Sequence, residues 1–456
     1  MRWRLLAGGL ALGLLLTAVA SAETVNARVR RNPRLKAGVD AGGRVLVFTP
    51  KPVQPGSTHS HFDTSATPNL LMEPSINSDL KVFKVDLTKQ AMQDLGWALG
   101  NFSVEVSYTD SANQGFNDPT LGDARKAALE MAANAWGLIL GSSVTVNVEA
   151  RFAEQTCEDG RGTLASAGPR FVFAGFAGGE AGILYPGPLA ESLAGDNLSA
   201  ADGSDPDAAD LRITVNSGID NQCLGPGSRF YYGLDNNVPA GEISFVTVAM
   251  HELGHGLGFV GLVDEATGEL FQGMPDIFTV RTYDAKKDKH WGEMTDAGRK
   301  KSAKRTRKVS FDGPKTTARA QRFLKGRVVI EVNAPAGLAG NYDVGEASFG
   351  PKIKKKGVTG DLVLVNDGSV KPTFGCLPLL NGGDVSGKIA VIDRGDCLFT
   401  EKVKNAQDAG ARGVIIVHNE AGPPPGLGGS DDSINIPAVR VGKKDGKKIK
   451  RVLRRE

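Results

Sequence analysis

The sequence has little of several features on which whole classes of protein depend. Its 456 residues include only four cysteines, six histidines and 6% aromatic residues, and its 54 Lys and Arg nearly balance its 51 Asp and Glu. The net charge of +3 gives no indication of a nucleic-acid partner. The basic clusters contain no interleaved aromatic residues, so we interpret them as solvated loops and helix faces: RKKSAKRTRK at 299–308, KIKKK at 352–356 and KKDGKKIKRVLRR at 443–455.

Long apolar runs are absent after the first 22 residues. At the N-terminus, Arg2 and Arg4 precede an apolar run that ends at Ala20, and Ala20-Ser21-Ala22 fits a signal-peptidase site. The run is short for a membrane span. The sequence therefore predicts a signal peptide at 1–22. It predicts a secreted or periplasmic protein with no membrane span after cleavage.

Export gives the four cysteines a meaning, because disulfides persist in an oxidising compartment. Four cysteines allow three pairings. Cys157 and Cys223 lie in one compositional block, and Cys376 and Cys397 lie in another. This distribution favours pairing within each block, which leaves no thiol for catalysis.

The pattern of secondary structure changes near residue 326. Before it, the sequence predicts helices within 86–97 and 122–140 and strands within 144–152 and 211–216, separated by Gly- and Asp-rich loops. After it, strands and helices alternate. GKIAVIDRG at 387–395, TEKVKNAQDAGA at 400–411 and RGVIIVHN at 412–419 predict a compact βαβ unit. With 41% hydrophobic residues the chain can form two or three domains.

The most informative motif is AMHELGHGLGF at 249–259. His251 and His255 are four residues apart, so they share one face of a helix and can bind one metal ion. We expect this helix to begin near Ser244 and to end at Gly256–Gly258. A catalytic zinc site usually has three protein ligands. The extended motif places the third at position 261, which is glycine here.

The third ligand must therefore come from elsewhere. His290 is a candidate on its distance along the chain, whereas His418 lies in the βαβ region. A zinc peptidase whose third ligand is a glutamate about twenty residues on is disfavoured, because 275 is Pro and 276 is Asp. Oxygen ligands are available at Asp264, Asp276 and Asp284, and the two remaining histidines lie in GSTHSHFDTSATPNLLMEP at 56–74.

That segment resembles the third-ligand region of metzincins of the leishmanolysin type. His61 is followed by Phe62, then by Met72 in NLLMEP, and then by MQDLGW at 92–97, in the order of that family. The resemblance implies that His61 is the third zinc ligand beside His251 and His255. It also implies that Met72 forms the hydrophobic floor under the metal. We expect His59 to be an exposed neighbour in the turn.

The order of the segments differs from that family. In leishmanolysin-like proteases this segment follows the zinc helix, whereas here it precedes the helix. The chain therefore resembles a circular permutation in which the C-terminal segment lies just behind the signal peptide. Proteins tolerate such a permutation when their termini lie close together at the surface.

The C-terminal region resembles a protease-associated (PA) domain. The matching residues are SGKIAVIDRGDCLFTEKVKNAQDAGARGVIIVHNE at 386–420 and INIPAVRVGKKDG at 434–446. The resemblance implies a domain that binds substrate or gates access, without chemistry of its own, and a Cys376–Cys397 bond. We predict an α+β metzincin-like domain, a twisted sheet with an active-site helix, carrying an inserted-type α/β PA domain. The predicted segments are 1–22 (signal peptide), 23–98 (third ligand and Met turn), 99–327 (zinc helix) and 328–456 (PA domain).

These patterns predict an exported zinc-dependent endopeptidase that acts on protein or peptide substrates. Three neutral imidazoles leave Zn²⁺ its full charge, and Glu252, beside the first ligand, can take the proton of a zinc-activated water as general base. We expect an extended substrate to pair with the strand at 211–216. The alternative is a non-catalytic exported PA-domain binding protein with a structural or decayed metal site. Glu252 favours the enzyme, since a structural site needs no general base.

Overall fold

The computed structural model describes residues 24–76, 80, 85–158, 161–201 and 208–454. The predicted signal peptide at 1–22 lies outside the described residues. Among the helices of the described residues, none has the length and apolar character that crossing a bilayer requires. The chain forms two compact units. The motif unit comprises 33–327, and the barrel unit combines the residues up to Asn32 with 328–456.

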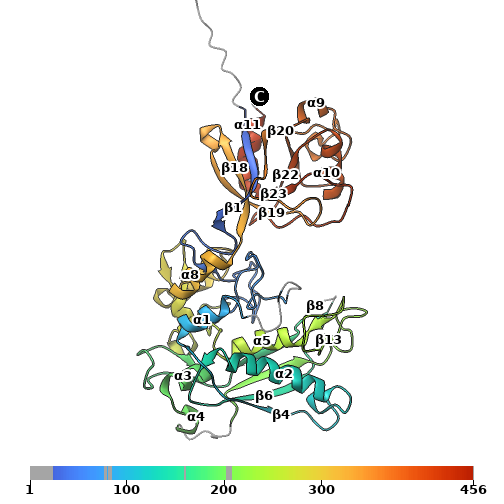
Figure 1. Cartoon of the computed structure of the whole chain (residues 1–456). Coiled ribbons are helices and arrows are strands. Elements are labelled where there is room, and N and C mark those ends of the chain that lie inside the picture. Colours follow the sequence, from blue (N-terminus) through green and yellow to red (C-terminus); the bar gives the residue numbers. More distant parts are fainter. Residues whose placement is uncertain (1–23, 77–79, 81–84, 159–160, 202–207, 455–456) are drawn as a thin grey trace, which may run out of the picture. The chain divides into compact units, whose positions relative to one another are not determined.

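The motif unit is built on a four-stranded mixed sheet (Figure 1). The central strand β6 runs parallel to β4 and β12, and β9 closes one side antiparallel to β12. Val146, Val148 and Ala150 of β6 are buried and alternate with more exposed residues, as the sequence pattern predicts. The strands in sheet order are β4 (Val104–Tyr108), β6 (Val146–Ala153), β12 (Leu211–Asn216) and β9 (Ala165–Pro169).

Two helices, α2 (Gly122–Gly137) and α5 (Phe245–Gly256), pack against each other, and α5 also contacts β9 and β12 (Figure 1). α5 carries the metal-binding motif and is buried along its whole length. It begins where the sequence predicts, with the Ser244 hydroxyl accepting the Thr247 N–H as N-cap. A Cβ on Gly256 would lie 2.9 Å from the Leu211 side chain, so glycine lets the helix end approach β12. The motif is thus held rigidly against the sheet.

Segments that are far apart in the sequence meet in the rest of the motif unit. A second sheet has the order β16–β15–β17–β2, in which only β2 precedes α5 in the chain. Helices α1 and α8 pack together, and the Asp94 carboxylate of α1 accepts the Thr316 N–H of α8 at 2.8 Å. The segment before β4 is therefore built into the region that follows α5. The bounds are β2 (Val45–Leu46), β15 (Thr282–Asp284), β16 (Lys289–His290), β17 (Val309–Phe311), α1 (Thr88–Leu95) and α8 (Pro314–Phe323).

The remaining elements of the motif unit are short. The helices are α3 (Gly187–Ala194), α4 (Leu198–Ala201), α6 (Ile277–Arg281) and α7 (Asp296–Ser302). The two-stranded pairs are β3 (Ala98–Leu99) with β5 (Leu140–Gly141), β7 (Cys157–Glu158) with β8 (Arg161–Gly162), β10 (Val172–Phe173) with β11 (Tyr185–Pro186), and β13 (Phe230–Tyr231) with β14 (Ile243–Ser244).

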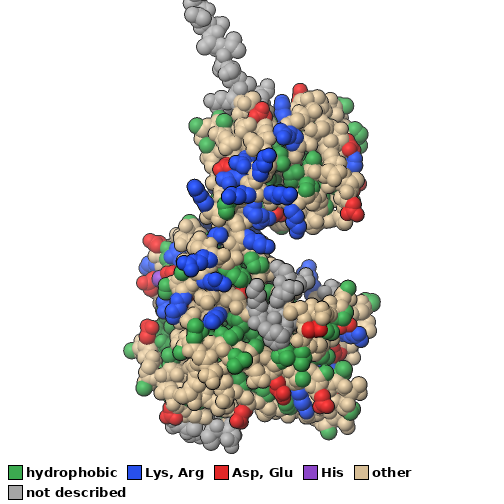
Figure 2. Space-filling model, viewed as in Figure 1, with side chains coloured by type: hydrophobic (Ala, Val, Ile, Leu, Met, Phe, Trp, Pro, Cys, Tyr) green, Lys and Arg blue, Asp and Glu red, His purple; other side chains and the backbone are tan. Residues whose placement is uncertain are grey.

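The basic cluster at 299–308 is mostly a solvated face, as its composition predicts. Figure 2 shows Lys and Arg side chains on the surface around α8. Three members of the cluster differ, because Arg299 pairs with Asp296, Arg305 with the fully buried Asp284, and Arg307 with the buried Asp63. These three guanidinium groups are structural. The exposed lysines are Lys300, Lys301, Lys304 and Lys308.

The barrel unit is a closed barrel of seven strands. Neighbours among β20, β21, β22 and β23 run parallel, and α10 joins β21 to β22 in the βαβ arrangement that the sequence predicts. The strands in barrel order are β1 (Asn26–Lys36), β18 (Gly326–Ala334), β19 (Gly340–Glu346), β23 (Ala438–Val441), β22 (Gly413–Val417), β21 (Ile389–Asp393) and β20 (Val358–Leu364). The helices are α9 (Gly382–Val385), α10 (Phe399–Asp408) and α11 (Lys443–Leu453).

The N-terminal strand differs from the sequence-based division, which placed 23–98 with the zinc helix. β1 pairs antiparallel with β20, from Asn26 opposite Asp361 to Val29 opposite Val358. Its apolar residues are buried in one core with Leu453 of α11. The apolar residues of VNARV alternate, as suits a strand, but nothing in this pattern specifies the unit in which the strand finds its partner.

Both disulfides pair within blocks, as predicted, and the described residues contain no free cysteine. Cys157–Cys223 lies in the motif unit, and Cys376–Cys397 lies in the barrel unit. The bonds join residues 66 and 21 positions apart in the sequence. Each unit therefore has its own covalent cross-link.

Removing one disulfide should destabilise only the unit that contains it. For loops of these two sizes the chain-entropy model gives about 4 and 3 kcal/mol. In scanning calorimetry, Cys376→Ser with Cys397→Ser should lower one transition, and Cys157→Ser with Cys223→Ser should lower another. Equal shifts of a single transition by both double variants would contradict two independently stabilised units.

A buried pair of carboxyl groups lies between α3 and the start of β12. Glu191 is 2% exposed and Asp210 is 1% exposed, and their side chains share a hydrogen bond. The Glu191 carboxyl also accepts the Leu198 N–H at 3.1 Å. Burial, and then the negative charge of Asp210, raise the pKa of Glu191 from 4.5 to about 7. The pair is therefore held by a shared proton near neutral pH.

This pair should make the protein less stable as the pH rises. The folded pKa of Glu191 exceeds its unfolded value, so the stabilising proton is bound below pH 4.5 in both states and is lost from the folded state only near pH 7. Glu191→Gln should therefore raise the unfolding free energy by about 1–3 kcal/mol at pH 8, with little gain at pH 5. Urea titrations at the two pH values test this. An equal loss of stability at both would refute the shared proton.

Candidate metal centre

Three histidines from two distant segments converge at one point. The Nε2 atom of His61 lies 3.2 Å from Nε2 of His251 and 3.1 Å from Nε2 of His255, and the last two nitrogens are 3.1 Å apart. All three side chains are buried, between 5% and 7% exposed. Among the His, Cys, Asp and Glu side chains of the described residues, these three histidines are the group that lies close enough together to hold one metal ion. The structure thus places His61 beside the helical pair.

Backbone carbonyls fix which ring nitrogens carry protons. Nδ1 of His61 contacts the Ser57 carbonyl at 2.9 Å, Nδ1 of His251 the Leu71 carbonyl at 2.6 Å, and Nδ1 of His255 the Phe259 carbonyl at 2.7 Å. A carbonyl only accepts, so each Nδ1 is the N–H donor and each Nε2 presents a lone pair. Three lone pairs therefore point toward one another with no donor among them.

This donor set fits zinc. Burial lowers the pKa of His251 to about 4 and that of His255 to about 3, and it lowers the pKa of His61 well below its usual value. The rings are therefore neutral near pH 7, as metal ligation requires. Tetrahedral ligands about 2.1 Å from a Zn²⁺ ion are ~3.4 Å apart, close to the observed separations. A carbonyl behind each ring is the usual orienting partner of a zinc-bound imidazole.

The segment from Ser57 to Met72 builds most of this arrangement. It supplies His61 and the two carbonyls that orient His61 and His251. The Phe62 N–H donates to the Met72 carbonyl at 2.7 Å, which closes the segment on itself. Met72 is fully buried, and its Sδ lies 2.8 Å from where a Cβ on Gly254 would stand. Met72 thus packs on the helix face that carries the two histidines.

Glu252 lies next to His251 on α5 and is 7% exposed. Burial raises the pKa of its carboxyl to about 8, and a hydrogen bond from the Ala167 N–H of β9 opposes this shift. A cation held by the adjacent imidazoles would favour the ionised carboxylate. The protonation state of the Glu252 carboxyl group therefore depends on the occupant of the neighbouring site.

The sequence predicts that residues 211–216, which form β12, pair with an extended substrate, and this prediction is wrong. β12 pairs with β6 on one side and with β9 on the other, so it has no open edge. β9 is one of the two outer strands of the sheet, the other being β4, and within the described residues it pairs only with β12. It is also the strand that reaches Glu252. Its sequence, ASAGP, has neither β-branched residues nor apolar alternation, so sequence patterns carry no signal for it.

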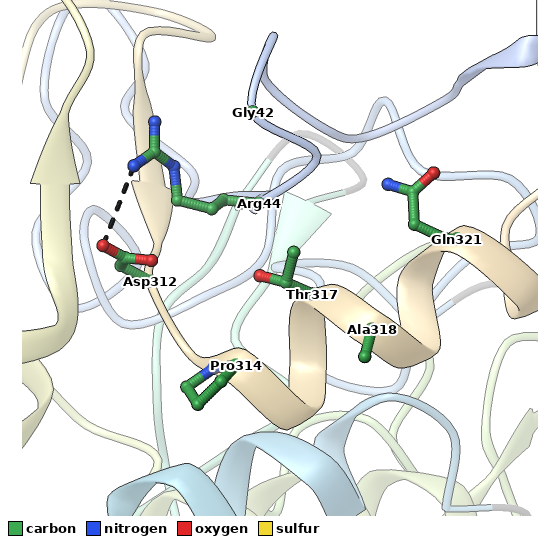
Figure 3. Close-up of a pocket in the computed structure, with 7 residues that line it drawn as sticks. All are labelled: Gly42, Arg44, Asp312, Pro314, Thr317, Ala318 and Gln321. Atoms are coloured by element: carbon green, nitrogen blue, oxygen red, sulfur yellow. Dashed lines mark ion pairs between the residues drawn. The ribbon is translucent and has the colours of Figure 1, made fainter.

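The other candidate ligands are engaged elsewhere. His290 lies on β16 with its Nε2 2.9 Å from Asp312. Asp312 lines a separate hollow beside α8, where it faces Arg44 at 3.7 Å (Figure 3). Asp276 caps α6, and Asp284 binds Ser302 and Arg305. Asp264 accepts the N–H groups of its own turn.

His59 contradicts its prediction as an exposed residue. It is fully buried, because its ring stacks on Trp291 with centroids 4.2 Å apart and meets Phe278 edge-on at 5.4 Å. A Cβ on Gly261 would lie 2.1 Å from the His59 ring. The position that holds the third histidine in the extended motif is therefore covered here by another imidazole.

In the barrel unit, His418 follows β22 and lies 3.4 Å from the Arg394 guanidinium. Burial and the neighbouring positive charges of Arg440 and Arg394 lower the pKa of His418. The charged groups that act on the ring are three cations, Arg440, Arg394 and Lys443, and one carboxylate, Glu420, and His418 is in no group of potential metal ligands among the described residues. His418 is therefore not a candidate zinc ligand.

Comparison with known proteins identifies one part of the chain. Residues 358–449 match the family model of the PA domain, which is therefore present in the barrel unit. The chain is 37% identical over 114 residues to receptor homology region, transmembrane domain- and RING domain-containing protein 1 of Oryza sativa subsp. japonica, covering 24% of this chain and 20% of that protein. It is 40% identical over 84 residues to aminopeptidase YwaD of Bacillus subtilis, covering 16% and 18%.

The solved structure of BSAP, a zinc aminopeptidase from Bacillus subtilis, is 32% identical to this chain over 26% of each, with a TM-score of 0.21. The chain spans about a fifth of the length of the two curated relatives. The match to the family model establishes the PA domain at 358–449. The leishmanolysin-like resemblance of the remaining residues stays a prediction.

The geometry predicts which histidine decides metal binding. His61→Ala removes one of three convergent nitrogens and should lower zinc affinity by at least about 100-fold, since a first ligand outweighs an orienting partner worth 10–100-fold. His290 lies outside the cluster, so the His290→Ala variant should bind zinc like the wild type. Competition with a fluorescent zinc chelator measures both. Equal zinc affinity of the His61→Ala variant would exclude this residue as a ligand.

Proposed function

We propose that this protein is an exported zinc-dependent endopeptidase. One observation carries the proposal. The Nε2 lone pairs of His61, His251 and His255 converge on one point, and the carboxyl group of Glu252 is buried next to His251 on α5. His61, His251 and His255 would hold the metal. A site that only stabilised the fold would close its fourth position and would have no use for a carboxyl group beside it.

The roles of the residues follow from their protonation states. A zinc ion held by the three neutral imidazoles would supply Lewis-acid chemistry, lowering the pKa of water toward ~7 and polarising a carbonyl group. Glu252 would accept the proton of the water and deliver it to the leaving amine. The carbonyls of Ser57, Leu71 and Phe259 would keep the imidazoles aimed during both transfers.

The substrate we propose is an extended peptide that lies along β9. The register of β9 with β12 pairs Ala167 with Ile213, and the Ala167 N–H points to Glu252 rather than into the sheet. An edge strand binds an extended chain through its unpaired N–H and C=O groups. This arrangement brings a peptide bond within the chain, rather than only a terminus, next to the metal centre. It favours an endopeptidase.

We further propose that the segment with His61 and Met72, within residues 33–98, supplies the third ligand and Met turn of a leishmanolysin-like metzincin in permuted order. This proposal is supported by the closeness of His61 to the two helical histidines and by the contact of Met72 with Gly254 of α5. The first and last parts of the described chain pack into one core, as Val25 and Leu453 do, which suits a permuted order. The PA domain would bind substrate or gate access, and the protein would be secreted or periplasmic.

The alternative is a non-catalytic PA-domain binding protein. One relative that shares the PA domain is named as a receptor homology protein rather than a peptidase. In that case the metal site would serve the fold alone, and Glu252 would have no role in it. The position of Glu252 beside the three imidazoles favours the enzyme.

Replacing Glu252 separates these two functions. Glu252→Ala should lower the rate of peptide hydrolysis by at least about 100-fold, because general base catalysis contributes 10²–10⁴-fold. Its zinc content should stay at about one per chain, since the ligands are histidines. Cleavage of an unstructured protein substrate and metal analysis measure the two effects. Absence of any zinc-dependent cleavage by the wild type would favour the binding protein.

A further inference from the structure

His59 is an unusual residue for its position. Its φ of +73° lies in the left-handed region, which residues other than glycine seldom adopt. It is fully buried, and Nδ1 of its ring has no hydrogen-bond partner. Both features are unfavourable for folding by themselves. Something in the surrounding structure must therefore hold the residue in this conformation.

The ring of His59 has the opposite tautomer to the three ligand histidines. Its Nε2 contacts the Thr282 hydroxyl at 3.1 Å, and that hydroxyl donates its own proton to the Phe278 carbonyl. The Thr282 oxygen therefore accepts, and Nε2 of His59 carries the proton. His59 is thus tied to β15 and to the Trp291 stack and not to the metal centre.

The same ring lies directly on Gly261. Only a residue without a side chain permits this contact, because a Cβ at position 261 would lie 2.1 Å from Cε1 of His59. The Gly261 N–H also donates to the Ser60 hydroxyl at 3.3 Å. Residues 59 and 60 are therefore docked on the chain just beyond the zinc helix. That stretch includes Phe259, whose carbonyl orients His255.

His59 lies in the middle of the turn that orients His61. The His59 N–H donates to the Phe48 carbonyl, and the Phe48 N–H donates to the His61 carbonyl, at 2.9 and 2.8 Å. On the other side of His59, the Ser57 carbonyl accepts the Nδ1 proton of His61. A change in the backbone at 59 would move both the ligand and the group that aims it.

We propose that His59 is a positioning residue for the metal centre. By docking on Gly261 it sets the distance of the His61 Nε2 atom from the two helical imidazoles. This inference rests on one part of the proposed function, namely that the three imidazoles bind a metal ion. It explains why glycine occupies the third-ligand position of the extended motif. At that position the ring of His59 docks the turn that carries His61.

The test is the affinity for Co²⁺ and the visible absorption of the bound ion, which reports ligand geometry independently of catalysis. His59→Gly, which relieves the backbone but removes the ring, should weaken Co²⁺ binding about tenfold or more and alter the spectrum. His59→Asn is the second variant, because asparagine tolerates a positive φ and keeps the turn folded. His290→Gly is the matched control and should leave affinity and spectrum unchanged.

Gly261→Ala should weaken Co²⁺ binding as well, because the added methyl group displaces the His59 ring. Combined with His59→Gly it should cost nothing further, since the clash has then lost its partner. If both His59 variants bind Co²⁺ within about twofold of the wild type and with its spectrum, the proposal is overturned. A wild-type protein that binds neither Co²⁺ nor Zn²⁺ would instead refute the metal site of the proposed function.

Discussion

Mutual repulsion among three imidazole lone pairs is the constraint on which the candidate centre depends. The Nε2 atoms are 3.1–3.2 Å apart, and no proton lies between them because each ring donates from its other nitrogen. In a buried site such an arrangement is unfavourable until a cation binds. The surrounding chain must therefore hold the rings together. It does so with a helix that is buried throughout and with carbonyls that leave the rings one orientation.

Because the orienting groups are backbone carbonyls, part of the centre cannot be predicted from the sequence. Any residue can present a carbonyl group, so nothing in the identities of Ser57, Leu71 or Phe259 marks them as orienting groups. The helical pair His251 and His255, by contrast, follows from spacing alone. His61 follows only from a family pattern, because no periodicity links residues 190 positions apart. Local physics predicts the helix and its two ligands, and the remainder depends on tertiary contacts.

The errors of sequence-based reasoning have the same origin. The apolar alternation of 211–216 correctly predicts a strand, but a strand's place in its sheet depends on which partners lie on either side. β12 is internal, and the unpatterned β9 is an edge strand. His59 reads as a polar turn residue, yet Trp291 and Phe278 come from a distant segment to bury it. The predictions of the disulfides and of the βαβ unit are correct because the partners lie within one block of sequence.

The pairing of β1 has a consequence for how the protein is made. Asn26 bonds to Asp361, a residue 335 positions later in the chain. At 5–20 residues per second, a ribosome needs roughly 20–70 s to synthesise what separates them. Throughout that interval Val25, Ala27 and Val29 have no barrel to enter, while the complete motif unit leaves the ribosome. A nascent chain thus carries an unsatisfied strand for most of its synthesis. The cell must keep that strand from pairing with a neighbour until the last quarter of the message has been read.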